Sequence, residues 1–446
     1  MKRAAVWLAL CCASGLVHSQ DTLTALAVCT GLQAADLQRL TLPMALDHAL
    51  CRSPAMRQAM LAIAEQQAGV DLAGSSYRPR VSANASLNAS RVAPIANTIG
   101  YSVENIAGSV GLGWVLFDFG LRNANLAQAQ AQLTVAMASL DNTQLQSTND
   151  TLRLYLDALT AWLRQSSLRE AEEVAQQSAR AASAKYDAQV GSLAEKLQAQ
   201  TALAQTVLER VRANGQWETA RAALAIHMGF GVNQSLALPE VEQAVPFIGQ
   251  TLAADQLLEN LRTQHPRMLA LQAEYEALKR RGESIAADGK GSVSASANVQ
   301  TSRAFSSGAG FERSANAALL ATIPLFNGVE QNARLAQNKA QADAKLAQID
   351  AARRELETEL QRQALVVQIE QQTQMAVRAL LDSASQSYQV ANGRYKAGVG
   401  TLAELLTAQA AVSNAVFASN QSRAVLATAL VRLAIAGGRI AVARQP

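Results

Sequence analysis

The sequence predicts a mainly α-helical chain with a pair of β-hairpins, in which one module of helix, hairpin and long helices is present twice. Three observations predict this class: an internal repeat at constant spacing, two long stretches without proline or glycine, and four segments of alternating apolar and small polar residues. Aromatic residues make up only 4% of the chain and alanine recurs throughout, which favours closely spaced helices over a core of large side chains.

The internal repeat has a register of 209 residues, the difference between positions 325 and 116. Leu-Phe-Asp at 116–118 matches Leu-Phe-Asn at 325–327, and the same offset aligns residues 186–195 with 395–404. Shared alanine would produce scattered matches but not one register held from 116 to 226. The chain is therefore a duplication.

Residues 121–190 and 329–392 contain neither proline nor glycine and are rich in Ala, Leu, Gln and Glu. Such stretches are typical of very long helices, and seventy helical residues would span about 105 Å. Leucines at 145, 152, 156, 159 and 163 recur at spacings of three, four and seven, which predicts a seam for neighbouring helices. A soluble coiled coil would show the same seam.

Residues 81–87 and 293–299 alternate strictly between apolar and small polar side chains, and partner strands are expected at 110–116 and 319–325. The hairpins would occupy about 77–118 and 290–327, with polar loops at 91–102 and 301–313. Alternation of this length fits membrane-spanning strands, although a soluble sheet packed on helices is the alternative.

Serine, asparagine and glycine on the second face of these strands favour a wet lumen over a soluble sheet core. Four strands cannot close a barrel, and open sheet edges are not tolerated in lipid. If the strands lie in a membrane, the chain must therefore oligomerise to about eight strands or more.

The N-terminus resembles a secretory signal peptide, with Lys2 and Arg3 before an apolar run and a small-residue cleavage site at 17–19. The run is too short to span a membrane, and Leu10 is a poor residue to precede a lipidated Cys11. The expected organisation is a signal peptide at 1–19, an N-terminal extension at 20–40, repeat 1 at 41–230, a linker at 231–251, repeat 2 at 252–438 and a tail at 439–446.

Two cysteines, Cys29 and Cys51, remain after removal of the signal peptide. In an oxidising compartment they would close one loop between the N-terminal extension and the first helix. Two unpaired thiols are the alternative.

The sequence contains no enzyme signature. The four histidines lack metal-ligand spacing, and there is neither a phosphate-binding glycine loop nor a nucleophile elbow. Lysine and arginine are scattered among acidic residues, which argues against nucleic-acid binding. We therefore expect no catalysis, no cofactor and no bound metal.

The ordered motifs resemble those of the TolC family of outer-membrane exit ducts over about residues 41–438. The resemblance is carried by Ala-Leu-Cys-Arg-Ser-Pro at 49–54, by the Leu-Phe-Asp/Asn starts of the long helices, and by Tyr-x-x-Gly/Gln-x-Gly-Ser/Thr-x-x-Glu at 186–195 and 395–404. It implies a homotrimer in the outer membrane whose chains share a 12-stranded β-barrel above a periplasmic α-helical tunnel. It also implies two partners, a periplasmic adaptor (a membrane fusion protein) and an energised inner-membrane ABC or proton-driven transporter.

The turns at 186–195 and 395–404 would lie at the periplasmic tip. Gly398 and Gly400 allow the chain to reverse after a long helix. Ser192 and Thr401 are each followed three residues later by glutamate, Glu195 and Glu404, which predicts two capping boxes.

The resemblance gives the tip residues further roles. Glu404 matches one position of an acidic ring that narrows the closed pore, and Glu195 is its counterpart in repeat 1. Gly400 and Thr407 stand where the family has a basic residue and a second acidic residue, so the family's full latch is not expected. Two tyrosines, Tyr186 and Tyr395, are expected in contacts between helices near the tip. The turn residues are expected at the tip where adaptors dock: Val190, Gly191, Gly398, Val399 and Gly400.

The predicted function is a passive exit duct for type I protein secretion or for efflux. A multidrug efflux outer-membrane factor is the alternative within this class. A periplasmic coiled-coil adaptor is the second class, but it would require a compact β domain, whereas this chain carries two hairpins of membrane-spanning length.

Overall fold

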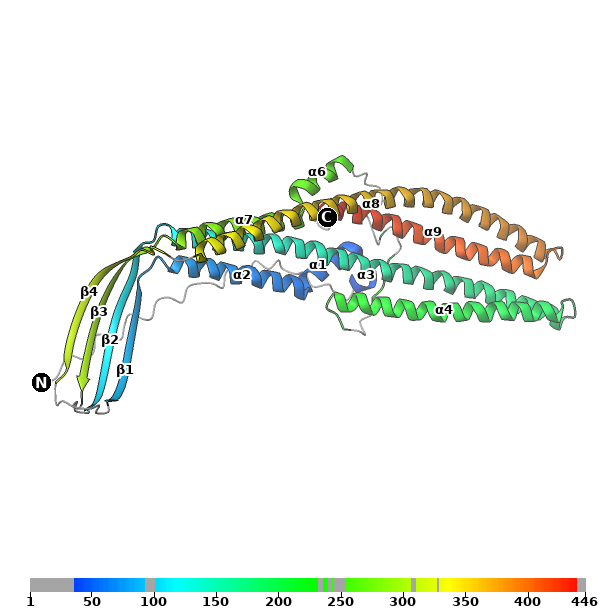
Figure 1. Cartoon of the computed structure of the whole chain (residues 1–446). Helices are drawn as coiled ribbons and strands as arrows, with labels where there is room; N and C mark the ends of the chain where they lie inside the picture. The colour runs from blue at the N-terminus through cyan, green and yellow to red at the C-terminus, as the bar shows by residue number, and fades with distance from the viewer. Residues whose placement is uncertain are drawn as a thin grey trace.

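The structure is a computed structural model that describes residues 36–92, 101–231, 236–239, 243, 254–305, 310–326 and 329–438 (Figure 1). The expected signal peptide, Cys29, most of the N-terminal extension and the tail lie outside these residues. Four strands lie at one end of the elongated molecule, and two helix-to-helix turns lie at the other end.

Four long helices form the body of the molecule. Helices α3 (Leu121–Asp187) and α8 (Glu330–Lys396) have 67 residues each, and α4 (Leu193–His227) and α9 (Leu402–Ala436) have 35 each. All four starts and ends obey the offset of 209, so the predicted duplication of long helices is confirmed. A helix of 67 residues spans about 100 Å.

Shorter helices complete each repeat. They are η1 (Asp36–Arg39), α1 (Leu42–Arg52) and α2 (Pro54–Ser75) in repeat 1, and α6 (Ala254–Gln264) and α7 (Pro266–Asp288) in repeat 2. Among the described helices, none combines the length and the apolar character that a membrane crossing requires.

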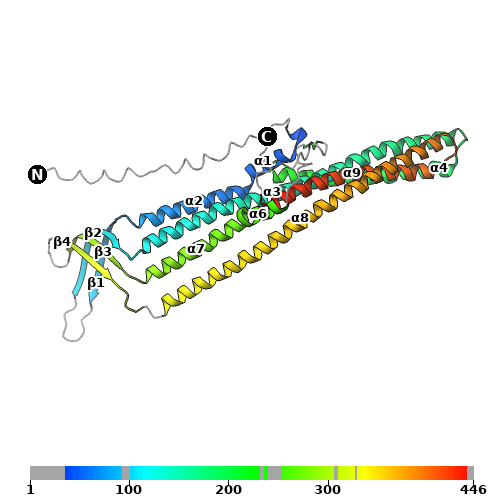
Figure 2. The ribbon, with the colours of Figure 1, turned by 90° about the horizontal axis from the view of Figure 1, so that it is seen from above.

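The helices form a layer whose order differs between its two halves. Near the strands, α2 packs on α3, α3 on α7, and α7 on α8 (Figure 2). Towards the turns, α4 packs on α3, α3 on α9, and α9 on α8. Helices α4 and α8 are thus the outer helices of the layer at the turn end, as Figure 1 also shows.

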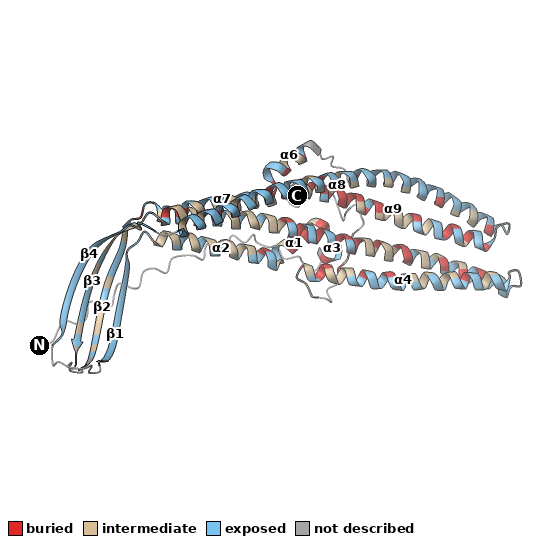
Figure 3. Cartoon of the chain, viewed as in Figure 1, coloured by how far each residue is buried: buried red, intermediate tan, exposed pale blue. Residues whose placement is uncertain are grey.

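Burial is concentrated in the middle of the helical body, whereas the strands are largely exposed (Figure 3). The predicted leucine seam on α3 lies in this core, and all of its members are buried: Leu145, Leu152, Leu156, Leu159 and Leu163. Tyr155 lies in the same core and donates its hydroxyl to the Leu40 carbonyl at 2.8 Å. The core therefore joins the segment before α1 to the long helices.

The four strands form one antiparallel sheet in the order β1-β2-β3-β4. They are β1 (Arg80–Val92), β2 (Tyr101–Phe117), β3 (Ser292–Ala304) and β4 (Glu312–Thr322). All four strand ends at the hairpin loops extend beyond the prediction, so the loops are shorter than 91–102 and 301–313. The prediction of a strand to residue 325 was wrong: β4 ends at Thr322, shortly before Pro324, which has no N–H for a sheet hydrogen bond.

The sheet register separates two chemically different faces. One cross-strand row contains Ala83, Val110, Val299 and Ala315, and the adjacent row contains Ser82, Gly111, Asn298 and Asn316. Neighbouring residues on a strand point to opposite faces, so apolar side chains line one face of the central sheet and small polar groups line the other. This is the pattern of a strand between lipid and water.

Candidate functional site

The two turns at the end opposite the sheet share one backbone geometry. In repeat 1 the N–H groups of Val190 and Gly191 donate to the Lys185 carbonyl at 2.9 and 3.0 Å. In repeat 2 those of Val399 and Gly400 donate to the Arg394 carbonyl, both at 3.0 Å. Each pair of bonds ends a 67-residue helix and reverses the chain.

Glycines serve two different purposes in these turns. Gly398 has φ +77°, a left-handed conformation, whereas its counterpart in repeat 1 is Gln189, which holds φ +63°. Gly191 and Gly400 instead allow close approach, because a Cβ would lie 2.9 Å from the Cβ atoms of Lys185 and Arg394, respectively.

The predicted capping box is complete in repeat 1 only. The Glu195 N–H donates to Ser192 Oγ at 3.1 Å, and the Ser192 N–H donates to Glu195 Oε2 at 3.4 Å. At Thr401 only the first half forms between the described residues, with the Glu404 N–H donating to Thr401 Oγ1 at 3.2 Å. The prediction of a second full box was wrong.

The Glu404 carboxylate faces a basic residue instead. Its Oε2 lies 3.9 Å from Arg394 Nε, and the two side chains are each more than half exposed. At this separation in water the attraction is weak, on the order of 1 kcal/mol or less. Glu404 therefore remains free to respond to other charges, as the pore-constriction hypothesis for Glu404 and Glu195 requires.

Thr407, the other position that departs from the family pattern, forms a hydrogen bond within its own helix. Its hydroxyl donates to the Ala403 carbonyl of the same helix at 2.8 Å. Thr407 thus serves the α9 backbone and supplies no second carboxylate at the tip.

The two tyrosines of the tip lie in different environments. Tyr395 is 8% exposed in a cluster with Ala182 of α3 and Leu402 of α9, and Lys185 Nζ lies 3.8 Å from its ring centroid. Tyr186 is 38% exposed, and Lys196 Nζ lies 4.7 Å from its ring centroid. Equivalent residues therefore have unequal contacts within one chain.

Two apolar side chains stand at the ends of the turns. Val190 is 76% exposed and Val399 is 70% exposed, beside Gly191 and Gly400. Both side chains are exposed apolar groups at the ends of the hairpins. The structure thus brings the predicted turn residues together in each repeat, at the tips of two parallel hairpins.

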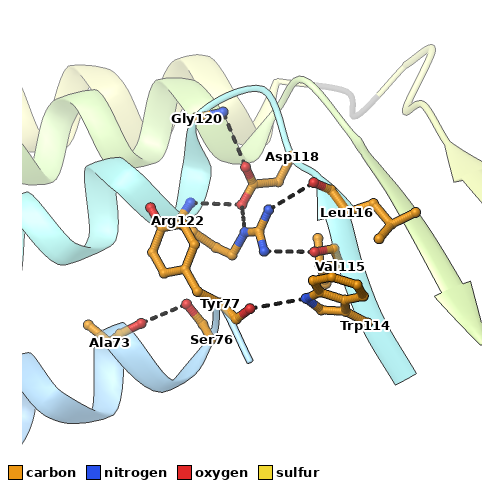
Figure 4. A network of polar contacts seen from close by, with 9 residues as sticks. All are labelled: Ala73, Ser76, Tyr77, Trp114, Val115, Leu116, Asp118, Gly120 and Arg122. Carbon is orange, nitrogen blue, oxygen red and sulfur yellow. Dashed lines mark hydrogen bonds and ion pairs between the residues drawn. The ribbon is translucent and has the colours of Figure 1, made fainter. Parts of the chain in front are cut away.

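A second organised region joins strand β2 to helix α3 (Figure 4). Arg122 Nε lies 2.8 Å from Asp118 Oδ2, and the same guanidinium donates to the carbonyls of Val115 at 2.7 Å and Leu116 at 3.3 Å. Asp118 also accepts the N–H groups of Gly120 and Arg122. This network fixes the direction of the helix relative to the strand.

Sequence reasoning found the Leu-Phe-Asp start of this helix but missed Arg122. The available signal was the four-residue spacing of opposite charges, with Asp118 just before the helix and Arg122 in its first turn. The junction is completed by Tyr77, whose carbonyl accepts Trp114 Nε1–H at 3.0 Å and whose ring lies under the Arg122 guanidinium at 4.8 Å.

Of the two cysteines singled out in the sequence, Cys51 lies at the end of α1 and is disulfide-bonded. Cys29 lies outside the described residues. The pairing of Cys29 with Cys51 stays a prediction.

A four-stranded sheet with a lipid-facing pattern, above duplicated long hairpins, defines a subunit of an outer-membrane channel. The chain belongs to the outer membrane efflux protein family, which matches residues 45–229 and 257–439. Protein CyaE of Bordetella pertussis (strain Tohama I) is 32% identical over 378 residues, which are 84% of this chain and 78% of that protein.

Solved structures agree on the fold. The outer membrane protein VceC of Vibrio cholerae superposes with a TM-score of 0.73 at 19% identity, covering 89% of this chain and 96% of that one. The CmeC outer membrane channel of Campylobacter jejuni gives 0.75 at 17% identity, covering 90% and 86%.

These findings confirm the TolC-like fold, the location in the outer membrane with a periplasmic extension, and the function of an exit duct. The alternative of a periplasmic coiled-coil adaptor does not fit this family.

Proposed function

We propose that three copies of this chain assemble into one passive exit duct for type I protein secretion or efflux. The duct works with a periplasmic adaptor and with an energised ABC or proton-driven transporter of the inner membrane. Substrates cross without being chemically changed, because the energy comes from the transporter.

The open sheet carries this proposal. Among the described residues, strands β1 and β4 each have a neighbour on one side only, and the sheet separates an apolar face from a polar one. Unpaired backbone groups at both edges cannot remain in lipid, so β4 of one copy must pair with β1 of the next. Three copies supply the 12 strands of a closed barrel.

The duplication supports the same closure. The pairing of β2 with β3 joins repeat 1 to repeat 2 within one chain. Because β4 is the counterpart of β2, and β1 that of β3, pairing of β4 with β1 repeats this contact between chains. Six similar hairpin units then follow one another around the barrel.

The test is isolation of the full chain from outer membranes in mild detergent. We expect a trimer that dissociates only on heating and that conducts ions in planar bilayers. A monomer that neither assembles nor conducts would refute the duct. Copurification with an ABC transporter or a proton-driven pump then distinguishes secretion from efflux.

We also propose that the adaptor docks on the tips through Val190 and Val399. Gly191 and Gly400 are poor sites for testing this, because any Cβ there would press on the preceding helix and distort the turn. Glutamate at both valines should abolish capture of the adaptor, whereas threonine at both, which is similar in shape, should weaken it less. Unchanged capture by an assembled trimer with both glutamates would contradict this docking site.

A further inference from the structure

Within the chain, the tip of repeat 1 contacts the tip of repeat 2 through a small apolar cluster and a cation–π pair. Helix α3 of repeat 1 packs on α9 of repeat 2, and near the tips Leu402 of α9 and Tyr395, at the end of α8, are buried in one cluster with Ala182 of α3. Lys185, at the end of α3, places its ammonium 3.8 Å from the centroid of the Tyr395 ring. A cation over an aromatic face at this distance is attracted by the ring electrons.

Each half of this contact has a counterpart in the other repeat at the offset of 209 residues. Tyr395 and Leu402 correspond to Tyr186 and Leu193, which in the single chain are 38% and 52% exposed, compared with 8% and 1%. Leu197, the counterpart of the partly buried Leu406, is 53% exposed. Repeat 1 therefore presents uncovered the apolar surface that repeat 2 buries.

The cationic half also has a counterpart. Lys185 corresponds to Arg394, whose side chain is 55% exposed on α8, at the opposite side of the molecule from α4. Leu193 and Leu197 thus lie on α4 and Arg394 on α8, the two outer helices of the layer, and Tyr186 lies at the end of α3, just before the turn into α4. The uncovered aromatic surface and the uncovered cation cannot reach each other within one chain.

We propose that these surfaces meet between neighbouring copies, with the Arg394 guanidinium of one copy over the Tyr186 ring of the next. Helix α8 then packs on the neighbour's α4 as α3 packs on α9 within the chain. This inference rests on the proposed trimer, in which consecutive copies follow one another around a ring. The occupant of the exposed surface is therefore a second copy of this chain.

Two local features shape this contact. Lys196 stands where repeat 2 has Leu405, and it already lies over the Tyr186 ring, with its charge balanced by Asp187 at 3.3 Å. Arg394 also lies 3.9 Å from Glu404 of its own chain. In the assembly the guanidinium would connect Glu404 of one copy to Tyr186 of the next, and separation of the tips would break this connection.

Cross-linking tests the contact directly. The full chain carrying Tyr186→Cys and Arg394→Cys is assembled in outer membranes, treated with a short bis-maleimide, and denatured. We expect covalent dimers and trimers. The matched variant Lys185→Cys with Tyr395→Cys should instead cross-link within single chains, and either cysteine of the first pair alone should give no dimer.

Conductance provides the second measurement. Arg394→Ala and Tyr186→Ala should each raise the open fraction of the resting duct about twofold to fivefold, and the double variant should add little to either. Tyr186→Phe keeps the ring and should behave like the unchanged chain. Lys396→Ala removes a neighbouring positive charge and should have no effect.

The outcomes separate this inference from the proposed function. A heat-dissociable trimer that conducts, but in which the first cysteine pair gives no linked chains, would overturn the Arg394–Tyr186 contact and leave the duct intact. Additive effects of Arg394→Ala and Tyr186→Ala would also overturn it. If no trimer forms from the unchanged chain, the duct itself fails.

Discussion

Gln189 is a residue whose backbone conformation suits another amino acid. It holds φ +63° at the turn where repeat 2 has Gly398. A side chain in the left-handed region costs about 1 kcal/mol because Cβ crowds the following carbonyl. Gln189→Gly should therefore stabilise the first tip by about that amount, measured by thermal unfolding of the assembled protein. Gly398→Gln should destabilise the second tip to a similar extent, and a neutral result there would contradict the argument.

Glu404 is the residue through which charge at the tip would act on transport. Under the pore-constriction hypothesis, three Glu404 carboxylates of the proposed trimer would approach one axis, where they would attract cations and repel one another. Glu404→Gln should reduce cation selectivity in bilayers, most clearly at low salt, where screening is weak. Glu195→Gln, which removes the carboxylate bound to Ser192, is the comparison. If neither change alters conductance or selectivity, the acidic ring is wrong.

At this scale the sequence predicted residue types better than residue environments. It identified both tip glutamates and both tyrosines from the repeated motif. It could not distinguish Glu195 in a closed capping box from Glu404 beside Arg394, or an exposed Tyr186 from a buried Tyr395. The motif is nearly the same in the two repeats, but its surroundings differ. Within one chain each repeat packs against the other on one side only.

At the scale of elements, the junction of β2 and α3 depends on Arg122. Its guanidinium binds one carboxylate and two strand carbonyls. Arg122→Ala would leave Asp118 without its charge partner and should destabilise the assembly by about 1–3 kcal/mol. Arg122→Lys restores the charge but not the fork of bonds, so it should rescue only part of the loss. The midpoint of heat dissociation measures both, and an unchanged midpoint for alanine would refute the role.

The start of α7 is expected to sense acid. His265 caps this helix by accepting the Arg267 N–H on Nδ1 at 3.2 Å. Burial, followed by the charge of Arg267, lowers the pKa of His265 from 6.5 to about 4. The fold thus favours the neutral ring of His265. Its contribution to the free energy of unfolding is fully present above pH 6.5 and is lost as the pH falls towards 4.

The loss amounts to about 3 kcal/mol at most. His265→Asn keeps an acceptor at the cap without a titrating ring, as Ser53 does at the start of α2. Between pH 7.5 and 4.5, the midpoint temperature of thermal unfolding should therefore fall less steeply for the variant than for the unchanged chain. Parallel curves would contradict the assignment.

The long helices and hairpins could be predicted because proline, glycine and alternation mark their limits directly. Strand ends were predicted less accurately: alternation continues through residue 325, but β4 ends at Thr322, before Pro324, which has no N–H for the sheet. The network at Arg122 could not be predicted, because its bonds to strand carbonyls depend on the angle between two elements. Only the fold supplies that angle.

At the scale of the whole molecule, the two faces of the sheet should respond oppositely to charge. Val299 and Asn298 are neighbours on β3 that point to the apolar and the polar face. Val299→Arg would place a cation in hydrocarbon at a cost of about 2–4 kcal/mol near the midplane and should reduce the yield of trimer. Asn298→Arg should assemble normally and shift ion selectivity. Equal yields for the two variants would contradict the assignment of faces.

The corresponding helices of the two repeats have equal lengths, 67 residues in α3 and α8 and 35 in α4 and α9. The two tips of a chain therefore extend equally far from the starts of α3 and α8. A gain or loss of residues in α3 alone would move the first tip relative to the second. A change of length would therefore have to occur in both repeats to keep the tips aligned. The offset falls from 212 to 209 between the starts of β1 and α3, within the hairpin, where a length difference does not move the tips. The residue counts of α3 and α8 therefore set how far the two tips lie from the sheet.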